Sequence, residues 1–160
     1  MRQLEPVYPD AKHPNSYQRG IEFQDFVCAR LAGVGIVLQN LQSKRYQYAI
    51  GENLQGFEIK LDDPCTRTNR LSIEIAEKTQ ADHAQWTPSG IMRNDNAWLY
   101  LQGNYEVLYI FSKSLLRRYY AKIQPPVHEL PTIQKFYIGF DVADRLAAKV
   151  MYFSDVTGVR

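Results

Sequence analysis

Residues 51–61, which decide the fold, read GENLQGFEIKL. From Phe57 onward apolar and charged residues alternate, and this is the period of a β-strand with one face turned to the core. Residues two apart in a strand point to the same side, so Glu58 and Lys60 should project together, opposite the apolar side chains. The glycines at 51 and 56 favour a break and a turn just before the strand.

Glu52 lies upstream of the strand, beyond the short turn 53–56. If the chain bends there, its carboxylate can approach that of Glu58. Two converging carboxylates repel each other unless a cation lies between them, and Mg²⁺ favours such hard oxygen ligands. A metal so held can activate water and stabilise the charge of a phosphoryl transition state. Lys60 can position or deprotonate the water, or offset charge on the phosphate.

A helix is expected upstream of this run. Asn15 or Ser16 can cap it, and Gly33 and Gly35 can end it. Its apolar residues recur at helical spacing: Phe23, Phe26, Val27 and Leu31. Glu22 lies beside this apolar stripe, so its carboxylate reaches either solvent or a polar pocket at the edge of the core.

The rest of the chain predicts further strands and helices. Residues 36–50 are expected to form a long strand or a hairpin, and Ser112 can cap a helix that runs to about Lys122. The remaining elements are expected at 71–75, 97–101, 105–111, a last strand at 136–140 and a helix from Asp141. This order suits a single α/β domain over 16–160, with a central mixed β-sheet flanked by helices. Residues 1–15 hold three prolines and are expected to form an extended arm.

These features resemble the PD-(D/E)XK nuclease superfamily, in which an acidic residue precedes a strand that bears (D/E)-x-K. Glu52 matches the first acid, Glu58 and Lys60 match the pair, and Glu22 matches a glutamate that an upstream helix often supplies. The resemblance implies a restriction-endonuclease-like fold and hydrolysis of DNA phosphodiesters. It also implies Mg²⁺, for which Mn²⁺ can substitute, held by Glu52 and Glu58, and a homodimer, since one site cuts one strand.

The resemblance has departures. The first acid is Glu with no proline before it, its distance to Glu58 is short, and the next strand carries Glu74. A literal copy of the signature, PDAK at 9–12, lies in the proline-rich arm, where no strand aims its side chains, and we interpret it as chance.

The helix after Ser112 carries Lys113, Arg117 and Arg118, which could form a nucleic-acid-binding stripe facing phosphates. A solvated helix face explains them as well. Glu58 and Lys60 could likewise be the solvated face of an edge strand, where charges deter aggregation. A nuclease fold without catalysis that binds DNA or supports an assembly, and an unrelated interaction protein with surface charges, are the two alternative functions.

Other classes lack support. The formal net charge of +2 does not by itself indicate nucleic acid, and no dinucleotide-binding, phosphate-loop or serine-hydrolase motif occurs. Cys28 and Cys65 show no metal-ligand spacing and suggest no disulfide framework. No run of eighteen apolar residues predicts a membrane span. We therefore expect a cytoplasmic protein, encoded by a bacterium or a phage.

Overall fold

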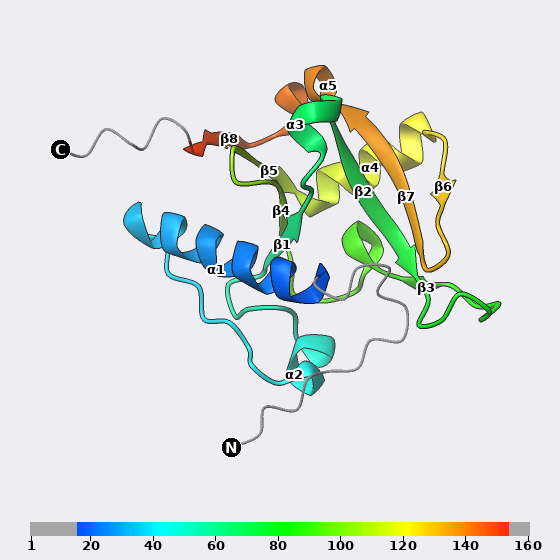
Figure 1. Cartoon of the computed structure of the whole chain (residues 1–160), viewed down its shortest axis with the longest axis horizontal. Coiled ribbons are helices and arrows are strands. Elements are labelled where there is room, and N and C mark those ends of the chain that lie inside the picture. Colours follow the sequence, from blue (N-terminus) through cyan, green and yellow to red (C-terminus); the bar gives the residue numbers. More distant parts are fainter. Residues whose placement is uncertain (1–15, 154–160) are drawn as a thin grey trace.

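The computed structural model describes residues 16–153, and β1 (Phe57–Leu61) lies at one edge of a sheet within them (Figure 1). The order of this first sheet is β1, β4 (Leu99–Gly103), β5 (Val107–Ser112) and β8 (Lys149–Tyr152). β1 runs parallel to β4, and the other pairs are antiparallel, so the sheet is mixed. The chain between β1 and β4 leaves this sheet, as a parallel connection requires.

The segment between β1 and β4 contributes two strands to a second, antiparallel sheet, and later residues contribute the other two. Its order is β3 (Thr87–Pro88), β2 (Arg70–Glu77), β7 (Ile133–Gly139) and β6 (His128–Glu129). β2 and β7 form a long twisted pair (Figure 1). A β-bulge between Glu74 and Ala76 interrupts their register.

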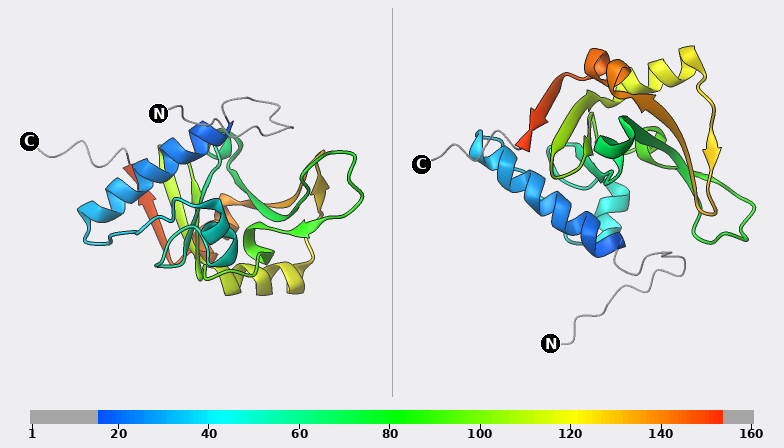
Figure 2. Two further views of the ribbon diagram at one scale, coloured as in Figure 1. Left: turned by 90° about the horizontal axis from the view of Figure 1, so that it is seen from below. Right: turned by 45° about the horizontal axis from the view of Figure 1, so that its top comes forward.

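The helices cover these sheets and their connections. They are α1 (Ser16–Gly33), α2 (Lys44–Ala49), α3 (Cys65–Thr68), the 3-10 helix η1 (Gly90–Met92), α4 (Lys113–Ile123) and α5 (Phe140–Leu146). α1 and α4 lie on opposite sides of the first sheet (Figure 2). Ser112 caps α4, because its Oγ accepts a hydrogen bond from the Leu115 amide at 3.4 Å.

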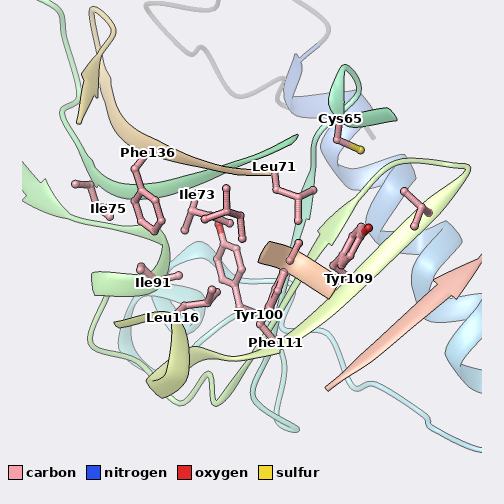
Figure 3. Close-up of a cluster of buried hydrophobic side chains, with 13 residues drawn as sticks. Cys65, Leu71, Ile73, Ile75, Ile91, Tyr100, Tyr109, Phe111, Leu116 and Phe136 are labelled. Carbon is pink, nitrogen blue, oxygen red and sulfur yellow. The ribbon is translucent and has the colours of Figure 1, made fainter. Parts of the chain in front are cut away.

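The alternation in β1 divides the core into two clusters. Phe57 and Ile59 pack against Phe23, Val27 and Leu31 of α1 on one face of the first sheet. The other face packs against the second sheet, α4 and α5. There, as Figure 3 shows, Tyr100 points toward Leu71 and Ile73 of β2, and Phe111 belongs to the same cluster. Glu58 and Lys60 belong to this second face, so they point into the space between the sheets rather than into open solvent.

A buried glutamine joins the two sheets. Nε2 of Gln102 on β4 donates to Oδ2 of Asp62 at 2.8 Å and to the carbonyl of Ser72 at 2.5 Å. The Ser72 amide donates to the same Asp62 oxygen at 2.7 Å. Gln102 is buried, so these hydrogen bonds compensate the burial of its Nε2 group and hold β2 near the end of β1.

Several predictions are confirmed and others are wrong. The helix over 16–33, the strands around 57–61 and 71–75 and the capped helix after Ser112 all form. The strand or hairpin over 36–50 does not form, and Lys44–Ala49 is helical instead. Its central residues, KRYQYA, are mostly good helix formers, whereas the β-branched residues stand at its ends. The single α/β domain with a mixed sheet is confirmed, although the strands divide between this sheet and a second, antiparallel one. The strand expected at 136–140 and the helix from Asp141 also form, as β7 and α5, but β8 follows them, so β7 is not the last strand.

Both cysteines are free thiols, Cys28 within α1 and Cys65 at the start of α3. Of the helices between residues 16 and 153, none combines the length and the apolar character needed to cross a membrane. The expected arm at 1–15, with the PDAK copy in it, lies outside the described residues.

Candidate functional site

The bend before β1 brings Glu52 back onto the strand. Asn53 is fully buried, and its side-chain amide bonds to both the carbonyl (2.6 Å) and the amide (2.9 Å) of Phe57. Gly51 and Gly56 have positive φ, which this turn requires. Oε2 of Glu52 then accepts from the Ile59 amide at 3.1 Å. Glu52 therefore satisfies a backbone donor on the unpaired edge of β1, as well as lying near Glu58.

Glu58 is a buried carboxylate held between two ammonium groups. Its side chain is 1% exposed, and Nζ of Lys60 lies 3.4 Å from Oε1. Nζ of Lys113, itself 2% exposed, donates to Oε2 at 3.2 Å and to Oδ1 of Asp95 at 2.9 Å. Because Lys113 opens α4 directly after β5, the chain turn between these elements determines where this cation lies.

Glu74 reaches the site from the second sheet. Oγ of the buried Ser89 donates to its Oε1 at 2.6 Å. Gly90 lies against the Glu74 backbone with φ +51°, and a Cβ there would come within 2.2 Å of the Glu74 carbonyl oxygen. The adjacent bulge in β2 is a common device for directing side chains near functional sites. Ser89 and Gly90 thus hold Glu74 in one position.

These side chains share a cavity of about 290 Å³. Glu58, Lys60, Glu74, Glu77, Ser89 and Arg93 line it, together with Tyr17, Lys44, Gln47, Tyr48 and Gly90. The carboxylates at and around it are Glu52, Glu58, Glu74, Glu77 and Asp95, and the cations at and around it are Lys44, Lys60, Arg93 and Lys113. Five carboxylates against four cations leave an excess of one negative charge at the cavity.

The electrostatics of the cluster keep Lys60 charged. Burial disfavours its ammonium form, but Glu74, Glu58 and Glu52 outweigh burial and raise the pKa of Lys60 well above its usual value. Burial also raises the pKa of Glu52; Lys60 opposes that rise, and Glu58 adds to it. A permanently charged Lys60 is suited to binding an anion, and poorly suited to accepting a proton from water.

A larger cavity of about 920 Å³ continues from the first. Tyr17, Gln47 and Lys60 line both, so the two hollows meet at Lys60. Glu52 lines only the larger one, whereas Glu58 and Glu74 line only the smaller. The pair expected from the sequence, Glu52 and Glu58, is therefore split between the two cavities.

Other predicted site residues lie elsewhere. Glu22 is exposed on α1, accepts a hydrogen bond from Gln18 at 3.2 Å, and lines neither cavity. Its helix turns other residues, among them Gln24 and Asp25, toward the larger cavity. The expected approach of Glu22 to the site does not occur.

The basic helix α4 is not an exposed stripe along its length. Lys113 is buried and points into the carboxylate cluster. Arg117 donates through its guanidinium to the backbone carbonyls of Ile91 and Arg93, which ties α4 to the loop below it. Arg118 is exposed. Of the three expected phosphate contacts, only Arg118 therefore has a surface position.

The sequence reading missed two members of the cluster. Asp95 lies in a polar loop without periodicity, so the sequence does not indicate where its side chain points. Lys113 opens a helix rich in basic residues, and we therefore expected it on the protein surface. The sequence indicated Glu74 and Ser89 only weakly as site residues, because Glu74 lies in an expected strand and Ser89 in an expected turn. Long-range contacts between residues 58, 95 and 113 complete the site.

The residues fit a divalent cation only in part. Among the described residues, no group of three or more His, Cys, Asp or Glu is arranged to hold a metal ion. Oε1 of Glu58 is nevertheless buried and accepts no hydrogen bond from residues 16–153, and the surrounding charge is negative. Mg²⁺ is commonly held by one or two carboxylates, with water and substrate phosphate completing its shell. The donor set is compatible with such a site.

No protein-family model matches the chain, and no curated protein or solved structure matches it either.

Proposed function

We propose that the protein is a metal-dependent endonuclease that hydrolyses DNA phosphodiester bonds. The observation that carries this proposal is the placement of Glu58 and Lys60 side by side on β1, facing Glu74 of β2 across one cavity. Carboxylates in negative excess beside a fixed ammonium suit a metal and a phosphate group together. We also propose that the mixed sheet, with α1 and α4 on its opposite sides, is of the restriction-endonuclease-like type.

In this proposal Glu58 and Glu74 hold Mg²⁺ or Mn²⁺. Glu52, the first acid of the expected pair, has a structural role, because its carboxylate already accepts the Ile59 amide. The bound metal would supply Lewis acidity to the phosphate and a more acidic water. Lys60, held charged by its neighbours, binds a phosphate oxygen and offsets the charge that develops there.

The surrounding residues position this pair. Ser89 fixes the orientation of Glu74 through the 2.6 Å hydrogen bond. Lys113, itself held by Asp95, fixes Glu58. Sites of this kind depend on such supporting contacts, because a displacement of the reacting groups by about 1 Å can cost roughly 10²-fold in rate.

The test is cleavage of plasmid, single-stranded and branched DNA with Mg²⁺, with Mn²⁺ or with EDTA. Lys60→Ala and Glu74→Gln are each expected to lower the rate by about 10²- to 10³-fold. Glu58→Gln is expected to do the same, with circular dichroism to confirm that the variant folds. Glu22→Gln is the matched control: it changes an exposed glutamate outside both cavities, and should leave the rate unchanged.

Two results would contradict the proposal. One is cleavage that persists in EDTA or in the Lys60→Ala and Glu74→Gln variants. The other is absence of cleavage by the wild type on every substrate and with both metals. A rate of duplex cutting per mole of protein that rises with protein concentration would support the homodimer that the family resemblance implies.

One observation favours a second candidate function. Glu58 already contacts two ammonium groups, so its charge is compensated without a metal. A nuclease-like domain that binds DNA without cutting it, or that supports an assembly, would need no metal and could have such a cluster of compensated charges. Calorimetric titration with Mg²⁺ and Mn²⁺ separates the two: no binding of either metal, together with DNA binding, supports the second candidate.

A further inference from the structure

Two exposed tyrosines stand at the mouth of the cavity that holds Glu58 and Lys60. Tyr48 of α2 is 70% exposed and Tyr17 of α1 is 40% exposed, and both residues line that cavity. Large aromatic side chains bury 150–250 Å² when packed, so leaving them in water forfeits a substantial hydrophobic gain. Their position beside the charged cluster indicates that they contact a bound ligand.

Each tyrosine has a cation on its ring. The guanidinium carbon of Arg93 lies 5.2 Å from the ring centroid of Tyr48. Nζ of Lys44 lies 5.3 Å from the ring centroid of Tyr17. Arg93 is itself held by Asp95 at 3.5 Å and by the Gln47 carbonyl at 2.5 Å, so the guanidinium beside the Tyr48 ring is fixed relative to the cluster.

We propose that this rim, formed by Tyr17, Lys44, Tyr48 and Arg93, binds the unpaired bases and the phosphates of single-stranded DNA. The inference rests on the proposed nuclease function in naming DNA as the ligand. Aromatic rings stack on bases of any sequence, and adjacent cations bind the backbone between them. In a duplex the base faces are covered by neighbouring base pairs, so rings at a rim can stack only where a strand is unpaired.

The two cavities together offer room for a strand. The rim residues and Lys60 line the smaller one, and Tyr17, Lys60, Arg70 and Lys135 line the larger one. A strand that stacks on Tyr48 would therefore pass its backbone over the ammonium of Lys60, beside Glu58 and Glu74. The rim would bind unpaired bases in preference to a duplex, and Lys60 would contact a phosphate of the bound strand.

The experiment measures binding in EDTA, so that the result does not depend on cleavage. The probes are a fluorescein-labelled oligodeoxythymidylate and, separately, a labelled duplex of equal length. We expect the wild type to bind the single strand more tightly than the duplex. Tyr48→Ala should weaken single-strand binding by about 5- to 100-fold, the loss of one stacked base. Tyr48→Trp should preserve it, because the larger ring still stacks.

Tyr46→Ala is the matched control. Tyr46 lies on the same short helix and is 56% exposed, but it lines neither cavity, so its loss should leave binding unchanged. Equal affinity for single strand and duplex, or no binding at all, would overturn the inference. So would a Tyr48→Ala variant that binds as the wild type does.

Cleavage assays separate this inference from the proposed function. Cutting by the wild type that Tyr48→Ala leaves unchanged on single-stranded substrate would overturn the rim and retain the nuclease. Binding of single strands that depends on Tyr48, with no cutting under any metal, would support the rim while the proposed function fails.

Discussion

The two faces of β1 are buried by different physical means. Phe57 and Ile59 pack against α1, and each such apolar side chain contributes roughly 1.5–3 kcal/mol through removal from water. On the other face Glu58 is equally buried but is a charge, and within residues 16–153 Lys60 and Lys113 compensate it. Buried ion pairs of this kind about break even against apolar residues of similar size. The apolar face explains the stability of the strand, and the charged face is better explained by function.

The largest effect should come from removing the buried cation. Lys113→Met leaves Glu58 without its partner at 3.2 Å and Asp95 without its partner at 2.9 Å. We expect the free energy of unfolding, measured by urea denaturation, to fall by about 3–5 kcal/mol. Ile59→Ala on the apolar face should cost a comparable roughly 2–5 kcal/mol through a cavity. Equal stability of Lys113→Met and the wild type at neutral pH would mean that the charged face is not held as the contacts indicate.

A smaller effect is expected at the contact that positions Glu74. Gly90→Ala introduces a Cβ within 2.2 Å of the Glu74 carbonyl oxygen at a residue with φ +51°. We expect a loss of about 1–3 kcal/mol in the free energy of unfolding and slower DNA cleavage, because Glu74 must shift. The control is Gly20→Ala within α1, where a Cβ meets no atom within 4 Å; it should stabilise the protein by roughly 0.5–1 kcal/mol. A Gly90→Ala variant with wild-type stability would contradict the contact.

The smallest effect concerns Glu52, at the free edge of β1. Its pKa in the folded protein is raised by burial above its ordinary value of about 4.5, so the folded state holds this proton more tightly than the unfolded chain. The contribution of Glu52 to the free energy of unfolding should therefore fall as pH rises from the ordinary range through the raised pKa, and stay constant above it. Denaturation of Glu52→Gln and wild type from about pH 4 to about pH 8 measures this difference. A flat difference between the two proteins would contradict it.

Local patterns were sufficient for several elements. The alternation in 57–61 predicted both the strand and the division of its faces, because the side-chain period of a strand is set by backbone geometry. The apolar spacing in α1 and the Ser112 cap of α4 acted in the same way, since helix contacts lie within four residues. Glycines at 51 and 56 likewise predicted the bend that brings Glu52 to β1.

Long-range contacts decided the rest. Residues 36–50 carry strand-like residues at both ends, yet apart from the single bridge between Asn40 and Asn53 no described strand pairs with them, and the central part is helical. β8 is four residues long and exists through its pairing with β5. The division into two sheets also depends on β2 pairing with β7 rather than with a strand of the first sheet. The alternation of apolar residues predicts a strand but not its partner.

The site divides in the same way. From the sequence alone, Glu58 and Lys60 could be placed on one face of a strand, because that relation is local. Their burial, the entry of Lys113 and Asp95, the arrival of Glu74 and the exclusion of Glu22 depended on the packing of distant segments. A side chain's direction follows from its own backbone, whereas what it meets depends on which element the fold places opposite it.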